Sequence, residues 1–149
     1  MTPEDQLEEM GPIDYVVLEW DGDQPVTGEV MPLLLDLVER GIIRILDIAF
    51  LVKDHDGSVS AIDFAEMARK SEGLDEFDGA ASGLLGQDDL EEAANALEPG
   101  TVAGILLWEN RWAAPVAVAL RRSGGQLVAS GRIPVQAIIA SLDAAEATV

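Results

Sequence analysis

Two tryptophan and glutamate pairs stand at the ends of two apolar stretches. Glu19 and Trp20 end the run IDYVVLEW, and Trp108 and Glu109 lie near the end of TVAGILLWEN, with the order within the pair reversed. An indole ring beside a carboxylate is a typical lining for a small-molecule pocket, because the ring stacks on the ligand and the carboxylate accepts hydrogen bonds. These four residues are therefore the candidate ligand-binding set. Anchoring in a core or an interface is the simpler explanation of the tryptophans, and the ligand pocket is the more specific alternative.

A second candidate is the acidic stretch KDHDGSVSAID, which holds the chain's one histidine, His55. It partly matches a calcium-binding loop that starts at Val52. Loop positions three, five, six and twelve are Asp54, Asp56, Gly57 and Asp63. Val52 has no side-chain oxygen for position one, and an aspartate replaces the bidentate glutamate of position twelve. We therefore predict a hairpin turn at Asp56-Gly57, with no metal site and no catalytic residue.

The composition argues against several other functions. The 149 residues include no cysteine, so thiolate catalysis, disulfides and cysteine-ligated metals are excluded. The formal charge is −19, from 28 acidic and 9 scattered basic residues, which disfavours nucleic acid and anionic membrane surfaces as partners. The acidic N-terminus differs from a signal peptide, and no apolar run is long enough to span a bilayer. The sequence predicts a cytoplasmic protein without a cofactor.

The glycine-rich segment GAASGLLG, residues 79–86, has three glycines at a spacing seen in several kinds of site. It is too short to cross a membrane, and acids flank it on both sides. A phosphate-binding loop would continue with a lysine and a hydroxyl residue, whereas Gln87 and Asp88 follow here. We predict a connection whose small residues let the backbone pack closely against neighbouring elements.

These candidate residues lie on an apparent internal repeat. Each half is predicted to contain a strand, a helix and a second strand, over about residues 13–53 and 101–133. In each half a proline and a glycine bracket the helix nine residues apart; they are Pro32 and Gly41, then Pro115 and Gly124. The prolines suit the first turns, and the glycines suit the left-handed conformation that closes a helix. Two strand–helix–strand units that are not related by duplication could show the same proline and glycine spacing, so this alternative to a repeat stays open.

The predicted fold class is α+β and ferredoxin-like. Two βαβ units would form one mainly antiparallel sheet with helices on one face. The connecting segment 54–100 adds the hairpin and a helix that begins at Asp88, and a final helix starts at Pro134. We expect a flexible acidic N-terminus over residues 1–10 and a single domain over 11–145.

Both faces of the strand at 42–53 are apolar. Phe50 lies on one face and Leu51 on the other, and only three charged residues interrupt the run. If helices cover one face, the other must be covered by the additional elements or by another subunit. We therefore predict self-association, as a homodimer or a larger assembly.

Four stretches carry a resemblance to a known family. They are GPIDYVVLEW, LLLDLVERGIIRILDIAFLVKDHDGSV, GLLGQDDLEEAANALEPGT and ALRRSGGQLVASGRIP. Over about residues 11–141 the chain resembles an uncharacterised actinobacterial family of unknown function. That family is similar to a broader one labelled as predicted membrane proteins, in which a longer glycine-rich apolar hairpin replaces residues 79–86. The resemblance implies no catalytic residues.

Two classes of function follow from the sequence. The first is a non-catalytic, self-associating module with a stress-related or scaffolding role, which agrees with the two apolar strand faces. The second is a small-molecule-binding protein or enzyme whose pocket lies at the strand ends, around Glu19, Trp20, Trp108 and Glu109. A cavity beside those four side chains would distinguish the second class from the first.

Overall fold

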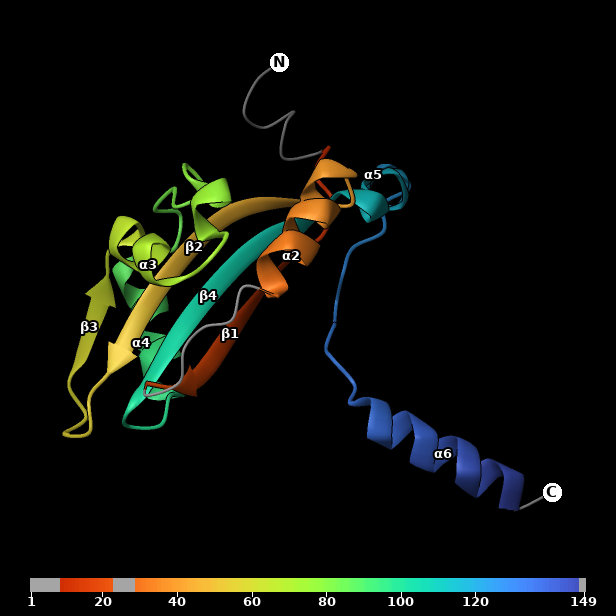
Figure 1. Ribbon diagram of the computed structural model, residues 1–149. Coiled ribbons are helices and arrows are strands. Elements are labelled where there is room, and N and C mark those ends of the chain that lie inside the picture. The colour runs from red at the N-terminus through yellow and green to blue at the C-terminus, as the bar shows by residue number, and fades with distance from the viewer. Residues whose placement is uncertain (1–8, 23–28, 148–149) are drawn as a thin grey trace. The chain divides into compact units, whose positions relative to one another are not determined.

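The computed structural model describes residues 9–22 and 29–147 and divides the chain into two compact units, residues 1–119 and 120–149 (Figure 1). In chain order the elements are β1 (Ile13–Asp21), α2 (Val30–Glu39), β2 (Ile43–Lys53), β3 (Val59–Ile62), α3 (Phe64–Lys70), the 3-10 helix η1 (Leu74–Phe77), α4 (Gln87–Asn95), β4 (Thr101–Asn110), the 3-10 helix η2 (Arg111–Ala113), α5 (Ala114–Arg122) and α6 (Val135–Ala147). The predicted flexible N-terminus, apart from its last two residues, lies outside the described residues.

The four strands form one sheet in the order β1-β4-β2-β3, and every neighbouring pair is antiparallel. The mixed α and β composition and the antiparallel sheet are therefore confirmed. Because β1 and β2 both run antiparallel to β4, they are parallel to each other, with α2 connecting them and β4 between them. The first predicted βαβ unit exists, but its two strands are separated by a strand from the second half of the chain.

The second βαβ unit is not formed. Gly41 and Gly124 both adopt the left-handed conformation that was predicted to close the two helices, with φ of 71° and 88°. Residues 126–133, however, form no strand and are all exposed. A strand is stabilised by backbone partners and by one buried face, and this segment has neither in its unit. The equal spacing of proline and glycine around the two helices was therefore not sufficient to indicate a ferredoxin-like duplication.

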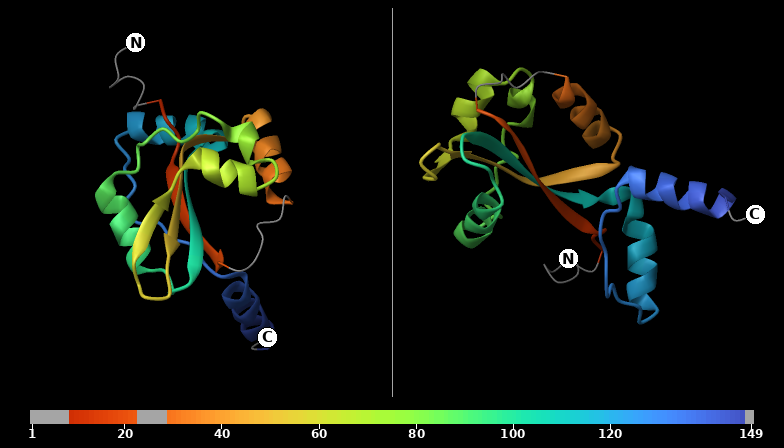
Figure 2. Two further views of the ribbon diagram at one scale, coloured as in Figure 1. Left: turned by 60° about the vertical axis from the view of Figure 1, so that its left-hand side comes forward. Right: turned by 90° about the horizontal axis from the view of Figure 1, so that it is seen from below.

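Helices cover both faces of the sheet, which corrects the prediction that they lie on one face (Figure 2). The elements α2, α3 and η1 cover one face, where Ile48 and Phe50 belong to the core. On the other face α4 packs against Leu51, Ala103 and Ile105. Phe50 and Leu51 are only 8% and 3% exposed, so both faces of β2 are buried as predicted. On the second face Leu51 packs against residues of the chain's own α4.

The second unit contains the end of α5, a connection over 123–134 and α6. The predicted final helix is present, and every described residue from 119 to 147 is exposed. Val135, Ile138, Ile139 and Leu142 follow the spacing of one helix face, so α6 has an apolar stripe that its own unit does not cover. None of the helices in the described ranges has the length and apolar character that a bilayer crossing requires.

Candidate functional site

The structure does not bring the four predicted ligand-binding residues together. Trp20 lies opposite Val102, which is six residues before Trp108 along β4. Six residues of strand span about 20 Å. Glu19 lies opposite Ala103 and is separated from Glu109 by the same number of residues. Since β1 and β4 are antiparallel, their carboxyl ends are at opposite ends of the sheet, and the four side chains do not surround one ligand.

At one end of the sheet, Trp20 packs into the core beneath α2 and α3. It lies over Gly104 beside Phe50, and a Cβ atom at Gly104 would be 3.5 Å from the Trp20 ring and 3.4 Å from the Phe50 ring. The neighbouring Glu19 accepts a hydrogen bond from the backbone N–H of Glu98, at 3.2 Å. Trp20 therefore acts as a core anchor, which was the alternative interpretation of this residue.

At the other end, Asn110 joins two tryptophans to the start of β1. Its Oδ1 accepts hydrogen bonds from the indole nitrogens of Trp108 at 3.1 Å and Trp112 at 3.3 Å. Its Nδ2 donates to the carbonyl of Pro12 at 3.0 Å and to Asp14 at 2.8 Å. The carboxamide is fully occupied within the protein, so its role is structural. In the sequence, only a polar residue at the end of an apolar strand pointed to this arrangement.

Glu109 is buried, and both of its carboxylate oxygens are bonded. Oε1 accepts from Nε of Arg44 at 2.9 Å, in a salt bridge that is partly exposed on the arginine side. Oε2 accepts from the backbone N–H of Gly11, also at 2.9 Å. A side chain at Gly11 would place its Cβ 2.3 Å from the carbonyl oxygen of Asn110, so only glycine fits this approach. Glu109 thus fixes the chain where it enters β1.

The residue that sequence reasoning missed is Asp47, which is 2% exposed beside an irregularity in the β2–β4 register. Its carboxylate accepts hydrogen bonds from the backbone N–H groups of Ile48 at 2.9 Å, Ser82 at 2.9 Å, Leu85 at 2.8 Å and Gly83 at 3.3 Å. The glycine-rich segment therefore wraps around an anion that belongs to the protein itself. The segment packs closely against β2, as its small residues predicted.

The predicted hairpin at residues 54–58 is present between β2 and β3, with Gly57 at a φ of 89°. Asp56 accepts hydrogen bonds from the hydroxyl of Ser58 at 2.6 Å and from its backbone N–H at 2.9 Å. The Ser58 hydroxyl bond holds the pKa of Asp56 below its ordinary value. The His55 ring lies against Gly100, where a Cβ atom would be 2.5 Å from Cε1. Among the described residues, no group of three or more histidines and acids is placed to hold a metal ion.

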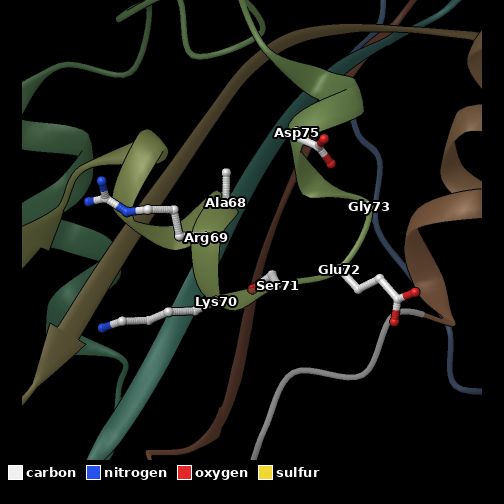
Figure 3. Close-up of a pocket in the computed structure, with 7 residues that line it drawn as sticks. All are labelled: Ala68, Arg69, Lys70, Ser71, Glu72, Gly73 and Asp75. Carbon is white, nitrogen blue, oxygen red and sulfur yellow. The ribbon is translucent and has the colours of Figure 1, made fainter.

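A surface hollow of about 620 Å³ lies where α3 ends, between Ala68 and Asp75 (Figure 3). Arg69 and Lys70 extend to one side of it and Glu72 to the other, so their charges diverge. Lys70 pairs with Glu66 of the same helix at 3.4 Å. The buried hydroxyl of Ser71 has no hydrogen-bond partner in the described part of the chain. Because the polar groups do not converge on a common point, this hollow is not organised as a catalytic site.

A groove of about 440 Å³ lies on the face of the sheet that α4 covers. Leu51, Val59, Ala61, Leu90 and Ala94 supply its apolar surface, and Gln87, Glu91 and Asn95 supply polar groups at the α4 side. It contains none of the four predicted ligand-binding residues. Glu91 is the one ionisable residue among the eight that line it, so the groove does not bring together the groups that a catalytic site needs.

Residues 9–149 match a family of unknown function, DUF6325. The chain belongs to this family. Comparisons with curated proteins and with solved structures give no significant match. Family membership therefore assigns no activity to this chain.

Proposed function

We propose that this chain is a non-catalytic, self-associating module that pairs through the outer edge of β1. The proposal is supported by the position of β1 at the edge of the sheet and by the exposed apolar side chains on it. β1 is the terminal strand of the sheet, and Ile13, Tyr15 and Leu18 on it are 49%, 65% and 55% exposed. An open strand edge presents backbone N–H and C=O groups that pair readily with another strand. This edge replaces the sheet face that the sequence suggested as the contact.

Two copies of β1 fit one another in an antiparallel arrangement. A two-fold axis through Val17, the middle residue of the strand, places no acidic residue directly opposite another acidic residue. The opposed pairs are Ile13 with Asp21, Asp14 with Trp20, Tyr15 with Glu19, and Val16 with Leu18. Like charges in directly opposite positions would destabilise the pair, and this register avoids them. The result would be a continuous sheet of eight strands.

The strength of self-association is expected to depend on the salt concentration. Full burial of each large apolar side chain contributes about 1.5 to 3 kcal/mol, in addition to the new backbone hydrogen bonds. The formal charge of −19 on each copy opposes association. Added salt screens this repulsion over a Debye length of about 8 to 10 Å, so association should strengthen from low to moderate salt.

The test is the substitution Leu18→Lys. It removes an apolar contact and places two positive charges near each other across the two-fold axis, so we expect the dimer to become a monomer at micromolar concentration. Light scattering at low and moderate salt measures the mass. The matched control is Leu33→Lys, which adds the same charge at an exposed position of α2 and should leave the dimer intact. A wild-type protein that is monomeric in both salts would contradict the proposal.

A further inference from the structure

Two tryptophans are held beside an exposed carboxylate, that of Asp14, at the start of β1. Trp108 lies directly opposite Asp14 where β1 pairs with β4. The indole nitrogens of Trp108 and Trp112 both donate to Oδ1 of Asn110, at 3.1 and 3.3 Å. The Nδ2 atom of Asn110 donates to Oδ2 of Asp14 at 2.8 Å. Asn110 therefore fixes two indole rings beside one acidic side chain.

The proposed β1 dimer adds the chain's third tryptophan to this group. Within one copy Trp20 is near the other end of β1, about 20 Å from Trp108. The two-fold axis through Val17, however, places Trp20 of the second copy directly opposite Asp14. Directly opposed residues of antiparallel strands share a face of the sheet, so Trp108, Asp14 and Trp20 of the second copy form one row. The axis repeats this row, and the dimer contains two equal sites that neither copy has alone.

The side chains of this row suit a cation. The Oδ1 atom of Asp14 accepts no hydrogen bond within the described part of the chain. The two tryptophans that flank Asp14 belong to strands two spacings apart, about 10 Å, so a cation above Asp14 would be about 5 Å from each of them. Cation–π attraction acts within about 6 Å of a ring centre. The formal charge of −19 on each copy also attracts cations.

The surroundings of Asp14 favour an organic cation over a metal ion. Hard cations such as calcium take at least six oxygen ligands, whereas this row offers one carboxylate between aromatic side chains. Aromatic walls beside a negative charge are typical of sites for quaternary ammonium groups. We infer that the β1 dimer binds organic cations of this class at its two sites. The inference rests on the proposed β1 dimer, which supplies Trp20, and Trp112, at 67% exposure, forms a third aromatic wall.

Binding of the cation should strengthen the dimer, because each site is complete only when two copies pair. The probe is choline chloride, compared with sodium chloride at the same ionic strength. Tryptophan fluorescence gives the affinity for choline, and light scattering over a dilution series gives the dissociation constant of the dimer. With two sites, a choline concentration equal to its own dissociation constant should lower that of the dimer about fourfold. Equal dimer dissociation constants in the two salts would overturn the inference.

Two substitutions test the carboxylate and the aromatic wall. Asp14→Asn retains an acceptor for Asn110 but removes the charge, and it should weaken choline binding about tenfold or more. Trp112→Leu should weaken it about twofold to fivefold, whereas Trp112→Phe retains a ring and most of the affinity. The matched control is Glu92→Gln, which removes a charge from an exposed position of α4, on the opposite face of the sheet. A loss for Glu92→Gln as large as that for Asp14→Asn would contradict the site.

The outcomes also separate this inference from the proposed function. A wild-type dimer that does not respond to choline would reject the cation sites and leave β1 pairing intact. A wild-type protein that stays monomeric with and without choline would reject both. Choline binding at full affinity to monomeric Leu18→Lys would show that Trp20 of a second copy is not needed, and would contradict the shared site. The uncharged alcohol in which carbon replaces the nitrogen of choline should bind at least tenfold more weakly, and equal binding would also overturn the inference.

Discussion

Replacing Asp47 with alanine is expected to lower the free energy of unfolding by about 2 to 4 kcal/mol, a large share of the stability of a domain of this size. The carboxylate is the acceptor for the backbone N–H groups of Ser82, Gly83 and Leu85, as well as for that of Ile48. Alanine would remove the acceptor that these four backbone N–H groups share, at a position that is only 2% exposed. Urea unfolding followed by tryptophan fluorescence measures the change.

Two variants control this prediction. Asp47→Asn retains the size of the side chain but has one acceptor oxygen and an amide that faces other donors. Its free energy of unfolding should therefore lie between those of the wild type and Asp47→Ala. Asp36→Ala removes an exposed acid whose bond to Arg40 spans 3.2 Å, and a change below about 0.5 kcal/mol is expected there. If Asp47→Ala were no more destabilising than Asp36→Ala, the glycine-rich segment would not be held by the carboxylate.

The sequence predicted local structure well because local signals determine it. The strand at 13–20, the hairpin at Asp56-Gly57 and the final helix after Pro134 all depend on periodicity and on turn residues within a few positions. Asp47 was visible only as an acid inside an otherwise apolar strand. Three of its four partners are 35 to 38 residues away, and no local pattern encodes a contact over that distance.

The content of the sheet was the part that the sequence did not predict correctly. The similar spacing of proline and glycine in the two halves suggested two equivalent units, but residues 126–133 form no strand, and β3 of the connecting segment occupies one edge of the sheet. The predicted pocket at Glu19, Trp20, Trp108 and Glu109 depended on strand ends that lie side by side. Because β1 and β4 pair antiparallel, their carboxyl ends lie at opposite ends of the sheet, and the two residue pairs are about 20 Å apart.

The topology also changes the argument for self-association. The sequence identified the apolar faces of β2 as unusual and inferred a subunit contact there. The structure assigns those faces to α2 and α3 on one side and to α4 on the other. Among the described residues, exposed apolar side chains lie instead on β1 and, within its own unit, on α6, so a charge introduced into β2 would test folding and not assembly.

Phe50→Ala and Leu51→Ala are accordingly expected to destabilise the fold by about 3 to 5 and 2 to 5 kcal/mol, because each change leaves a cavity in a different core cluster. Phe50 packs under α3 and Leu51 packs against Ala93, Ala94 and Leu97 at α4. Leu33→Ala, at an exposed position of α2, is the control and should lower the free energy of unfolding only slightly. Urea unfolding measures all three variants.

The result for Leu51 decides how the second face of the sheet is covered. If α4 covers it within each chain, Leu51→Ala should lower stability by the same amount at every protein concentration. If a second subunit covered it, the difference in stability between Leu51→Ala and the wild type would depend on concentration, whereas dissociation of a β1 dimer on dilution would destabilise both proteins alike. A small loss for Leu51→Ala, equal to that of Leu33→Ala, would mean that α4 does not pack on this face. The sheet face would then again be a candidate contact between subunits.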